Sequence, residues 1–220
     1  IQRILTHHAQ GTTDMTPEMM SNPVENYASD AVLEQERTTL FREFPLILGH
    51  SSELPDAGSF MTNNDTGMPL LITRNSEGEV QAFLNVCRHR GARVEDRPCG
   101  KARAFSCPYH SWTYALNGQL LAGPNIRAVP DFPKSEICLT GVATEVFHGF
   151  IFVNLDPNAA PMDEWFPGVR EELGAFVPHI DALKPVEWVE IPEKCNWKVS
   201  IENYSECYHC SLNHKTFATG

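Results

Sequence analysis

The sequence predicts an α+β fold, in which an all-β metal-binding region lies between a helical N-terminal segment and a mixed C-terminal segment. Three observations support this fold class. Apolar residues recur at helical spacing over residues 29–44, they alternate with polar residues over residues 70–86, and helical spacing returns after residue 164. Paired Cys and His residues follow the alternating region, which indicates a metal site in the β domain.

The N-terminal segment is expected to contain one helix, beginning after Ser29 and ending before Pro45. Ser29-Asp30 is an N-cap signal, and proline cannot continue a helix. The apolar positions of this helix are Leu33, Leu40, Phe41 and Phe44. Residues 1–44 therefore form the first predicted segment of the chain.

Residues 45–156 are predicted to form the β domain. Strands are expected at residues 70–74, 80–86 and 150–153, with a turn at 75–78. Asn117-Gly118 predicts a type I′ turn between two short strands. The metal-binding motifs would then lie at hairpin tips, where side chains from two loops can converge on one site.

A proline-containing stretch at residues 157–167 predicts the boundary to a second domain, residues 157–220. A helix is expected at 164–176, a strand at 186–191, and a last helix from residue 197 to about residue 210. The apolar stripe of the last helix consists of Trp197, Ile201, Tyr204 and Tyr208.

The composition limits the class of protein. The 220 residues carry a formal net charge of −11 without a basic run, which argues against nucleic-acid binding. No apolar stretch approaches the ~20 residues of a membrane helix, and the N-terminus lacks the apolar region of a signal peptide. Seven cysteines, an odd number, fit no complete disulfide framework. We therefore expect a cytoplasmic protein that does not bind membranes.

The most informative motifs are Cys87-Arg-His89 and Cys107-Pro-Tyr-His110. Each offers one thiolate and one imidazole. A [2Fe–2S] cluster that holds two Cys on one iron and two His on the other requires this mixed supply. A structural zinc site is the alternative, although its paired ligands usually lie two to four residues apart, whereas one residue separates Cys87 from His89.

The residues around these ligands carry a resemblance to a known family. Cys87-Arg-His-Arg-Gly91 and Cys107-Pro-Tyr-His-Ser-Trp112 resemble the cluster loops of Rieske non-haem iron oxygenases, in their large (alpha) subunit. The opening of that family's mononuclear-iron domain is similar to Asn196-Trp-Lys198, Glu202-Asn-Tyr204 and Glu206-Cys-Tyr-His209 followed by His214. The resemblance implies a Rieske [2Fe–2S] domain at residues 45–156. It also implies the start of an α+β, helix-grip-like catalytic domain at 157–220, truncated at Gly220.

Two histidines and a carboxylate near the C-terminus suggest a second metal site. His209 and His214 with Glu206 match the ligand set of O₂-activating non-haem iron enzymes, and Glu206 and His209 would share a helix face. The family resemblance implies a different role for Glu206: a later carboxylate completes the iron site, while Glu206 bridges His209 to His110 of a neighbouring subunit. We favour the bridge over a third iron ligand or a solvated glutamate.

Two details qualify these motifs. Ser111 stands where the family most often has glycine, so the second cluster loop must adopt a conformation that tolerates a Cβ atom. Cys207 and Cys210 have the spacing of a redox Cys-x-x-Cys pair, but they enclose His209, for which the iron-ligand interpretation is stronger.

The string Glu-Asn-Tyr-Ser-Glu-Cys-Tyr-His-Cys at residues 202–210 is similar to the branch that acts on choline, carnitine, glycine betaine and stachydrine. This resemblance implies hydroxylation beside nitrogen, or oxidative N-demethylation, of a quaternary ammonium compound with O₂. It also implies a mononuclear Fe(II), electrons from NAD(P)H through a separate flavin and iron–sulfur reductase, and a homotrimer. The alternatives are an aromatic-ring dioxygenase and, in another class, a non-enzymatic Rieske electron carrier.

Overall fold

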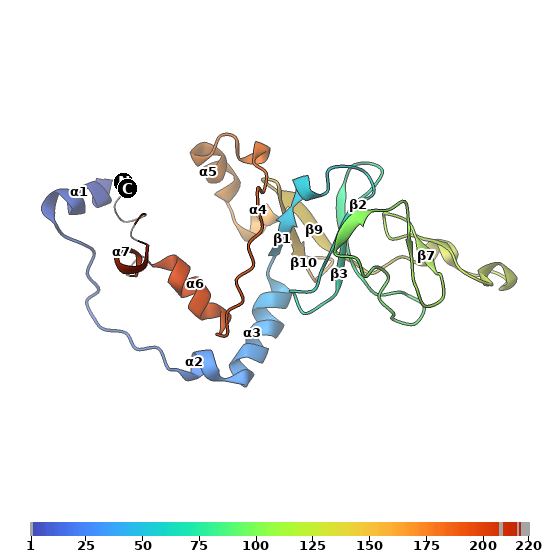
Figure 1. Cartoon of the computed structure of the whole chain (residues 1–220), viewed down its shortest axis with the longest axis horizontal. Helices are drawn as coiled ribbons and strands as arrows, with labels where there is room; N and C mark the ends of the chain where they lie inside the picture. The colour runs from blue at the N-terminus through green and yellow to red at the C-terminus, as the bar shows by residue number, and fades with distance from the viewer. Residues whose placement is uncertain (1, 207–208, 215, 217–220) are drawn as a thin grey trace. The chain divides into compact units, whose positions relative to one another are not determined.

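The computed structural model describes residues 2–206, 209–214 and 216. The chain forms two compact units, Gln35–Ile191 and the combination of Ile1–Glu34 with Pro192–Gly220. Figure 1 shows their helices and strands. Within the described residues, no helix has the length and apolar character needed to cross a bilayer. The fold class predicted from the sequence is confirmed, because helical segments lie before and after a β domain in the chain.

Two antiparallel sheets form the larger unit. The strands of the first sheet pair in the order β1-β10-β9-β4-β3-β2-β5. Their bounds are β1 Leu46–His50, β2 Ser59–Asn63, β3 Leu70–Arg74, β4 Val80–Leu84, β5 Cys99–Lys101, β9 Gly141–Phe147 and β10 Phe150–Asn154. The second sheet has the order β6-β7-β8, with β6 Phe105–Ser106, β7 Thr113–Tyr114 and β8 Leu120–Ala122.

Strand β3 lies between two apolar cores. Leu70 and Ile72 belong to a cluster with Ile151 and Val153, whereas Leu71 belongs to a cluster that also contains both cysteines of the cluster motifs, Cys87 and Cys107. Successive strand residues point to opposite faces, so one strand serves both cores. Each fully buried Leu or Phe side chain contributes about 1.5–3 kcal/mol. The predicted cluster loops therefore rise from the best-packed part of the unit.

The predicted helix in the N-terminal segment is confirmed as α3, Asp30–Glu43. The Ser29 hydroxyl accepts a hydrogen bond of 3.5 Å from the Val32 N–H, which matches its predicted place at the N-terminus. Two shorter helices were not anticipated, α1 at Gln2–Gln10 and α2 at Glu25–Ala28. In the smaller unit, the Tyr27 hydroxyl donates to Glu202 Oε1 at 2.6 Å, which ties the N-terminal residues to the C-terminal segment.

The predicted strands at 70–74 and 150–153 are confirmed by β3 and β10, and β4 ends two residues before the predicted strand does. The predicted type I′ turn at Asn117-Gly118 is wrong. Gly118 has a φ of 81°, but Asn117 is not among the residues with positive φ, and a type I′ turn needs both. The Gly118 N–H donates to the Ala115 carbonyl at 3.0 Å, so a type I turn precedes a left-handed glycine.

The segment that follows the β domain differs more from the predictions. The helix expected at 164–176 is broken into α4, Met162–Trp165, and α5, Val169–Phe176, because Pro167 and the left-handed Gly168 lie between them. The strand expected at 186–191 is wrong: in the described structure this stretch has no strand partner, and the Val186 side chain is fully exposed. An alternating pattern forms a strand only where a neighbour supplies backbone partners.

Four short 3₁₀ helices connect these elements: η1 Ser51–Glu53, η2 Ile126–Ala128, η3 Lys134–Glu136 and η4 Ile180–Ala182. The last two helices are α6, Trp197–Ser205, and α7, Cys210–Asn213. The helix predicted for 197–210 therefore ends at Ser205. Glu206 is extended, with φ −130° and ψ 155°, so the prediction that Glu206 and His209 share one helix face is wrong.

Candidate metal centre

The first cluster loop is a hairpin tip that extends from β4. Val86 forms an antiparallel bridge with Arg93, which closes the loop. Inside it, the Cys87 N–H donates to the Ala92 carbonyl at 2.8 Å, and the Gly91 N–H donates to the Cys87 carbonyl at 2.9 Å. These bonds fix the backbone of the loop, so the Cys87 side chain is held in one place.

The second cluster loop connects β6 with β7 and repeats this hydrogen-bond pattern. The Cys107 N–H donates to the Trp112 carbonyl at 2.8 Å, and the Ser111 N–H donates to the Cys107 carbonyl at 2.9 Å. Gly91 and Ser111 occupy the same place in the two loops, with φ of 72° and 55°. Ser111 thus lies in the small left-handed region that a residue with a Cβ atom can occupy.

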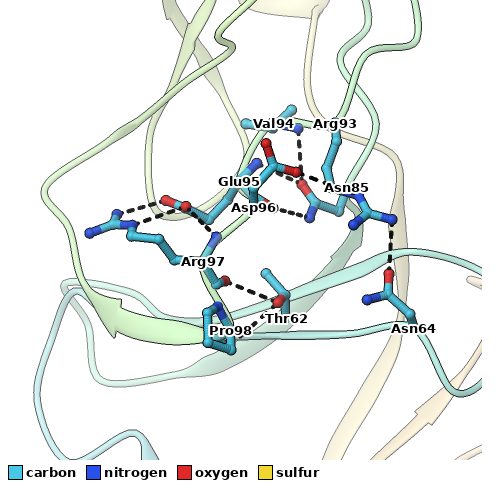
Figure 2. Close-up of polar contacts among 9 residues, drawn as sticks. All are labelled: Thr62, Asn64, Asn85, Arg93, Val94, Glu95, Asp96, Arg97 and Pro98. Carbon is cyan, nitrogen blue, oxygen red and sulfur yellow. Dashed lines mark hydrogen bonds and ion pairs between the residues drawn. The ribbon is translucent and has the colours of Figure 1, made fainter.

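Figure 2 shows how the chain that leaves the first loop is fixed. The buried Asn85 side chain accepts hydrogen bonds from the N–H groups of Val94 and Glu95 at 3.1 and 3.0 Å, and donates to the Glu95 carbonyl at 2.7 Å. Arg97 holds the Glu95 carboxylate through two bonds and keeps the pKa of that carboxyl below its usual value. Sequence reasoning missed Asn85, because only burial reveals that its amide must be satisfied locally.

The two cysteine side chains are buried side by side under the loops. Cys87 is 3% exposed and Cys107 is 2% exposed. The Tyr114 hydroxyl lies 3.3 Å from Cys87 Sγ and accepts a hydrogen bond from the Arg88 N–H at 3.0 Å. Burial raises the pKa of the Cys107 thiol, and the adjacent Cys87 raises it further. The Cys107 thiolate is therefore disfavoured unless a bound metal compensates its charge.

The two histidines of the motifs meet above the cysteines. The ring centroids of His89 and His110 are 4.8 Å apart, and the planes are inclined by 67°. His110 Nδ1 is buried and has no hydrogen-bond partner in the described structure. Burial and the positive charges of His89 and Arg90 lower the pKa of His110, which favours the neutral imidazole that binds metals. Because unpaired buried nitrogens are rare, His110 Nδ1 fits a metal ligand.

The four side chains supply two sulfur and two nitrogen donors, which fits a Rieske cluster. Among the described residues, no three Cys, His, Asp or Glu side chains gather closely enough to hold one metal ion. A zinc ion would need four donors within about 2.0–2.3 Å of one point. A Rieske cluster instead takes two Cys on one iron and two His on the other, which is the supply that these two loops offer.

The second predicted site lies on the segment that follows α6. Glu206 Oε1 is 2.7 Å from His209 Nδ1, and the rings of His209 and His214 are 5.3 Å apart. The short helix α7 lies between the two histidines, with His209 at its N-cap and His214 at its C-cap. Cys207, half of the alternative redox pair, lies outside the described residues. The structure thus brings Glu206, His209 and His214 together without the single helix that the sequence predicted.

Two family models match the chain in order. The Rieske [2Fe–2S] domain matches residues 44–133, and the catalytic domain of the ring hydroxylating alpha subunit matches residues 180–219. Together with the loop geometry, these matches place the chain among the large subunits of Rieske non-haem iron oxygenases, as the motifs predicted.

Two named relatives are similar to this chain over most of its length. The carnitine monooxygenase oxygenase subunit of Acinetobacter baumannii is 35% identical over 193 residues, which are 87% of this chain and 52% of that protein. The glycine betaine monooxygenase oxygenase subunit of Pseudomonas aeruginosa is 36% identical over 195 residues, 88% of this chain and 44% of that protein. The chain therefore spans about half the length of these relatives.

A solved structure shares the fold as well as the sequence. It is the structure of a quaternary ammonium Rieske monooxygenase, described as giving insights into carnitine oxidation by gut microbiota and inter-subunit electron transfer. It matches with a TM-score of 0.81 and 34% identity, over 89% of this chain and 53% of that chain. The fold similarity thus extends over both regions of the sequence that the two family models match.

Proposed function

We propose that this chain belongs to the oxygenase component of an enzyme that uses O₂ to hydroxylate or N-demethylate a quaternary ammonium compound. The observation that carries the proposal is the convergence of two hairpin tips, with Cys87 and Cys107 buried below His89 and His110. These four residues are the proposed cluster ligands. When bound, the cluster stores one electron and a mononuclear iron activates O₂.

The chain's own residues prepare the cluster site. The two buried thiols lie where water is excluded, and the Tyr114 hydroxyl is placed to donate to Cys87 Sγ. The hydrogen bonds within each loop hold the ligands in place before metal binds. The neutral form of His110 is favoured, so its Nδ1 can bind iron without first losing a proton.

Glu206, His209 and His214 form the second half of the proposal. His209 and His214 would bind the mononuclear iron, and Glu206 would be the electron bridge to His110 of a neighbouring subunit. The 2.7 Å contact between Glu206 Oε1 and His209 Nδ1 supports this bridging role, because a carboxylate in contact with an imidazole orients it and leaves Nε2 for the metal. The third iron ligand would be a carboxylate beyond Gly220.

The substrate class rests on the named relatives, which act on carnitine and on glycine betaine. Hydroxylation of a carbon beside nitrogen gives a carbinolamine, which releases an aldehyde and leaves the demethylated or shortened amine. Electrons would come from NAD(P)H through a flavin and iron–sulfur reductase. We also propose that the protein is a homotrimer, because bridging by Glu206 requires a neighbouring subunit. We propose a cytoplasmic location for it.

The test uses the full-length protein that contains this chain, reconstituted anaerobically. We expect about three irons and two sulfides per chain, and a Rieske-type paramagnetic signal after reduction. A panel of quaternary amines and arenes, supplied with O₂ and a reductase, should give aldehyde from an amine. Oxidation of arenes alone would support the ring-dioxygenase alternative. A cluster without mononuclear iron would support the electron-carrier alternative, and zinc without iron would reject the proposal.

A further inference from the structure

The imidazole of His89 lacks the partner that usually orients a metal-binding histidine. Such a ligand normally donates its second ring nitrogen to a carboxylate, a carbonyl or water, which fixes the ring. In the described part of the chain, His89 is exposed, and its ring has aromatic neighbours but no side-chain hydrogen bond. The protein contacts that can orient this ring are therefore its aromatic neighbours.

The indole of Trp112 supplies such a contact. The two rings are stacked, with centroids 4.8 Å apart and planes inclined by only 7°. Trp112 comes from the second cluster loop, so the stack joins the loop of Cys107 to the loop of Cys87. Stacked aromatic rings attract each other beyond what the area that they bury accounts for. This attraction favours one ring orientation over others.

Trp112 is itself held from behind by the segment that follows β8. Phe132 meets the indole edge-on, with centroids 6.0 Å apart and planes at 86°. Gly123 lies so close that a Cβ atom there would come within 2.9 Å of Trp112 Nε1 and 2.5 Å of Ile126 Cδ1. The indole therefore has no room to move on this side. Trp112, Phe132 and His89 also line one open hollow of about 430 Å³.

We propose that Trp112 is a positioning residue for the cluster ligand His89, and that Gly123 and Phe132 hold its indole in place. The inference rests on the proposed function, since it requires His89 to be a ligand. By covering one face of His89, the indole limits the access of water. Reduction adds a negative charge to the cluster, and water stabilises that charge, so the covered site has the lower reduction potential.

The test is a redox titration of the full-length protein with its cluster, combined with electron paramagnetic resonance of the reduced form. Trp112→Leu should retain iron and sulfide. Its reduction potential should shift to more positive values, and its paramagnetic resonance signal should broaden around each g-value. Trp112→Phe keeps a ring and should shift less. Trp165→Leu is the matched control, because Trp165 lies in α4, outside the cluster loops, and packs against Phe44 with ring centroids 5.1 Å apart. The control should titrate like the unmodified protein.

Gly123→Ala tests the same inference without removing the indole. The added methyl group should displace Trp112 and shift the potential in the same direction as Trp112→Leu, by a smaller amount. If Trp112→Leu keeps its cluster but has the potential and g-values of the control, the inference is overturned. If Trp112→Leu loses its cluster, an unshifted Gly123→Ala overturns it. Failure to oxidise quaternary amines would reject the proposed function alone, because neither measurement involves a substrate.

Discussion

At the scale of single residues, Tyr114 is the hydroxyl neighbour of Cys87, a proposed cluster ligand. Its side chain is fully buried. Burial raises the pKa of its hydroxyl far above the usual value, and the contact with Cys87 raises this pKa further. The phenol is therefore always a donor, and its hydroxyl lies 3.3 Å from Cys87 Sγ. A hydrogen bond to sulfur strengthens when reduction adds negative charge, so it raises the reduction potential.

Tyr114→Phe should therefore lower the reduction potential of the cluster. Loss of one hydrogen bond of about 1 kcal/mol corresponds to a shift on the order of 40 mV for one electron. A redox titration measures this shift. Tyr204→Phe is the matched control, because Tyr204 is 82% exposed in α6, outside the cluster loops. Equal potentials in the two variants would contradict the role assigned to the Tyr114 hydroxyl.

At the scale of elements, the hairpin turn before β8 depends on one glycine. Gly118 has a φ of 81°, and a Cβ atom there would come within 2.7 Å of Phe83 Cε1 and 3.0 Å of Cys138 Sγ. Backbone conformation and core packing thus both require glycine at this position. The turn fixes the hairpin of β7 and β8, on which the second cluster loop is built.

Gly118→Ala should lower the free energy of unfolding by about 2–4 kcal/mol, from left-handed strain and overpacking together. Gly78→Ala is the control, because Gly78 has a similar φ of 88° with nothing within 4 Å of the added Cβ. The control should lose only about 1–2 kcal/mol, from strain. Urea unfolding measures the free energy of unfolding of both variants. Equal decreases would show that packing against Phe83 contributes nothing.

A second element-scale feature is the connection between the β9–β10 turn and helix α5. His148 Nε2 contacts the Arg170 carbonyl at 2.9 Å, and Nδ1 contacts Asp181 Oδ1 at 3.0 Å. Both partners can only accept, so both bonds form only when the imidazole is protonated. These partners raise the pKa of His148, the Arg170 carbonyl first and Asp181 second.

This connection should make stability depend on pH. A raised pKa in the folded state adds stability that is fully present below the unfolded pKa of about 6.5 and is lost as pH rises through the folded value. The other charged groups at this junction, Glu145 and Asp163, both pair with Arg170. As the pH rises above about 6.5, the unmodified protein should therefore lose more unfolding free energy than His148→Gln. Parallel curves in urea titrations would contradict this account.

At the scale of the whole molecule, the proposed electron route passes between subunits. His110→Ala should disable the route at the cluster, and Glu206→Ala should disable it at the bridge. Each variant alone should be nearly inactive. In a mixed head-to-tail trimer, an intact cluster from a Glu206→Ala chain can face an intact Glu206 from a His110→Ala chain.

Co-assembly of the two variants should therefore restore activity. Random mixing in equal amounts gives about one quarter of the junctions this productive pairing, and so about one quarter of the unmodified turnover. Aldehyde release measures it. The control is a mixture of separately assembled trimers, which should remain inactive. A route within one subunit predicts no recovery in either case, because every chain carries one defect.

The sequence by itself determined the features that depend on local spacing: the Cys and His pairs, the helix after Ser29, the strands β3 and β10, and the hairpin tips that carry the cluster loops. It also indicated the histidines proposed to bind iron, whose roles remain predictions together with the two domain boundaries. Motifs and periodicity contain this information because neighbours in the chain are neighbours in space.

Only the tertiary structure decided which distant groups support these motifs. Tyr114 reaches Cys87 across 27 positions, and the stack of Trp112 on His89 joins two loops. Glu206 contacts His209 although no helix joins them, and residues 186–191 alternate like a strand but have no described partner. Burial, stacking and hydrogen-bond satisfaction depend on contacts between residues far apart in the chain, which no local pattern specifies.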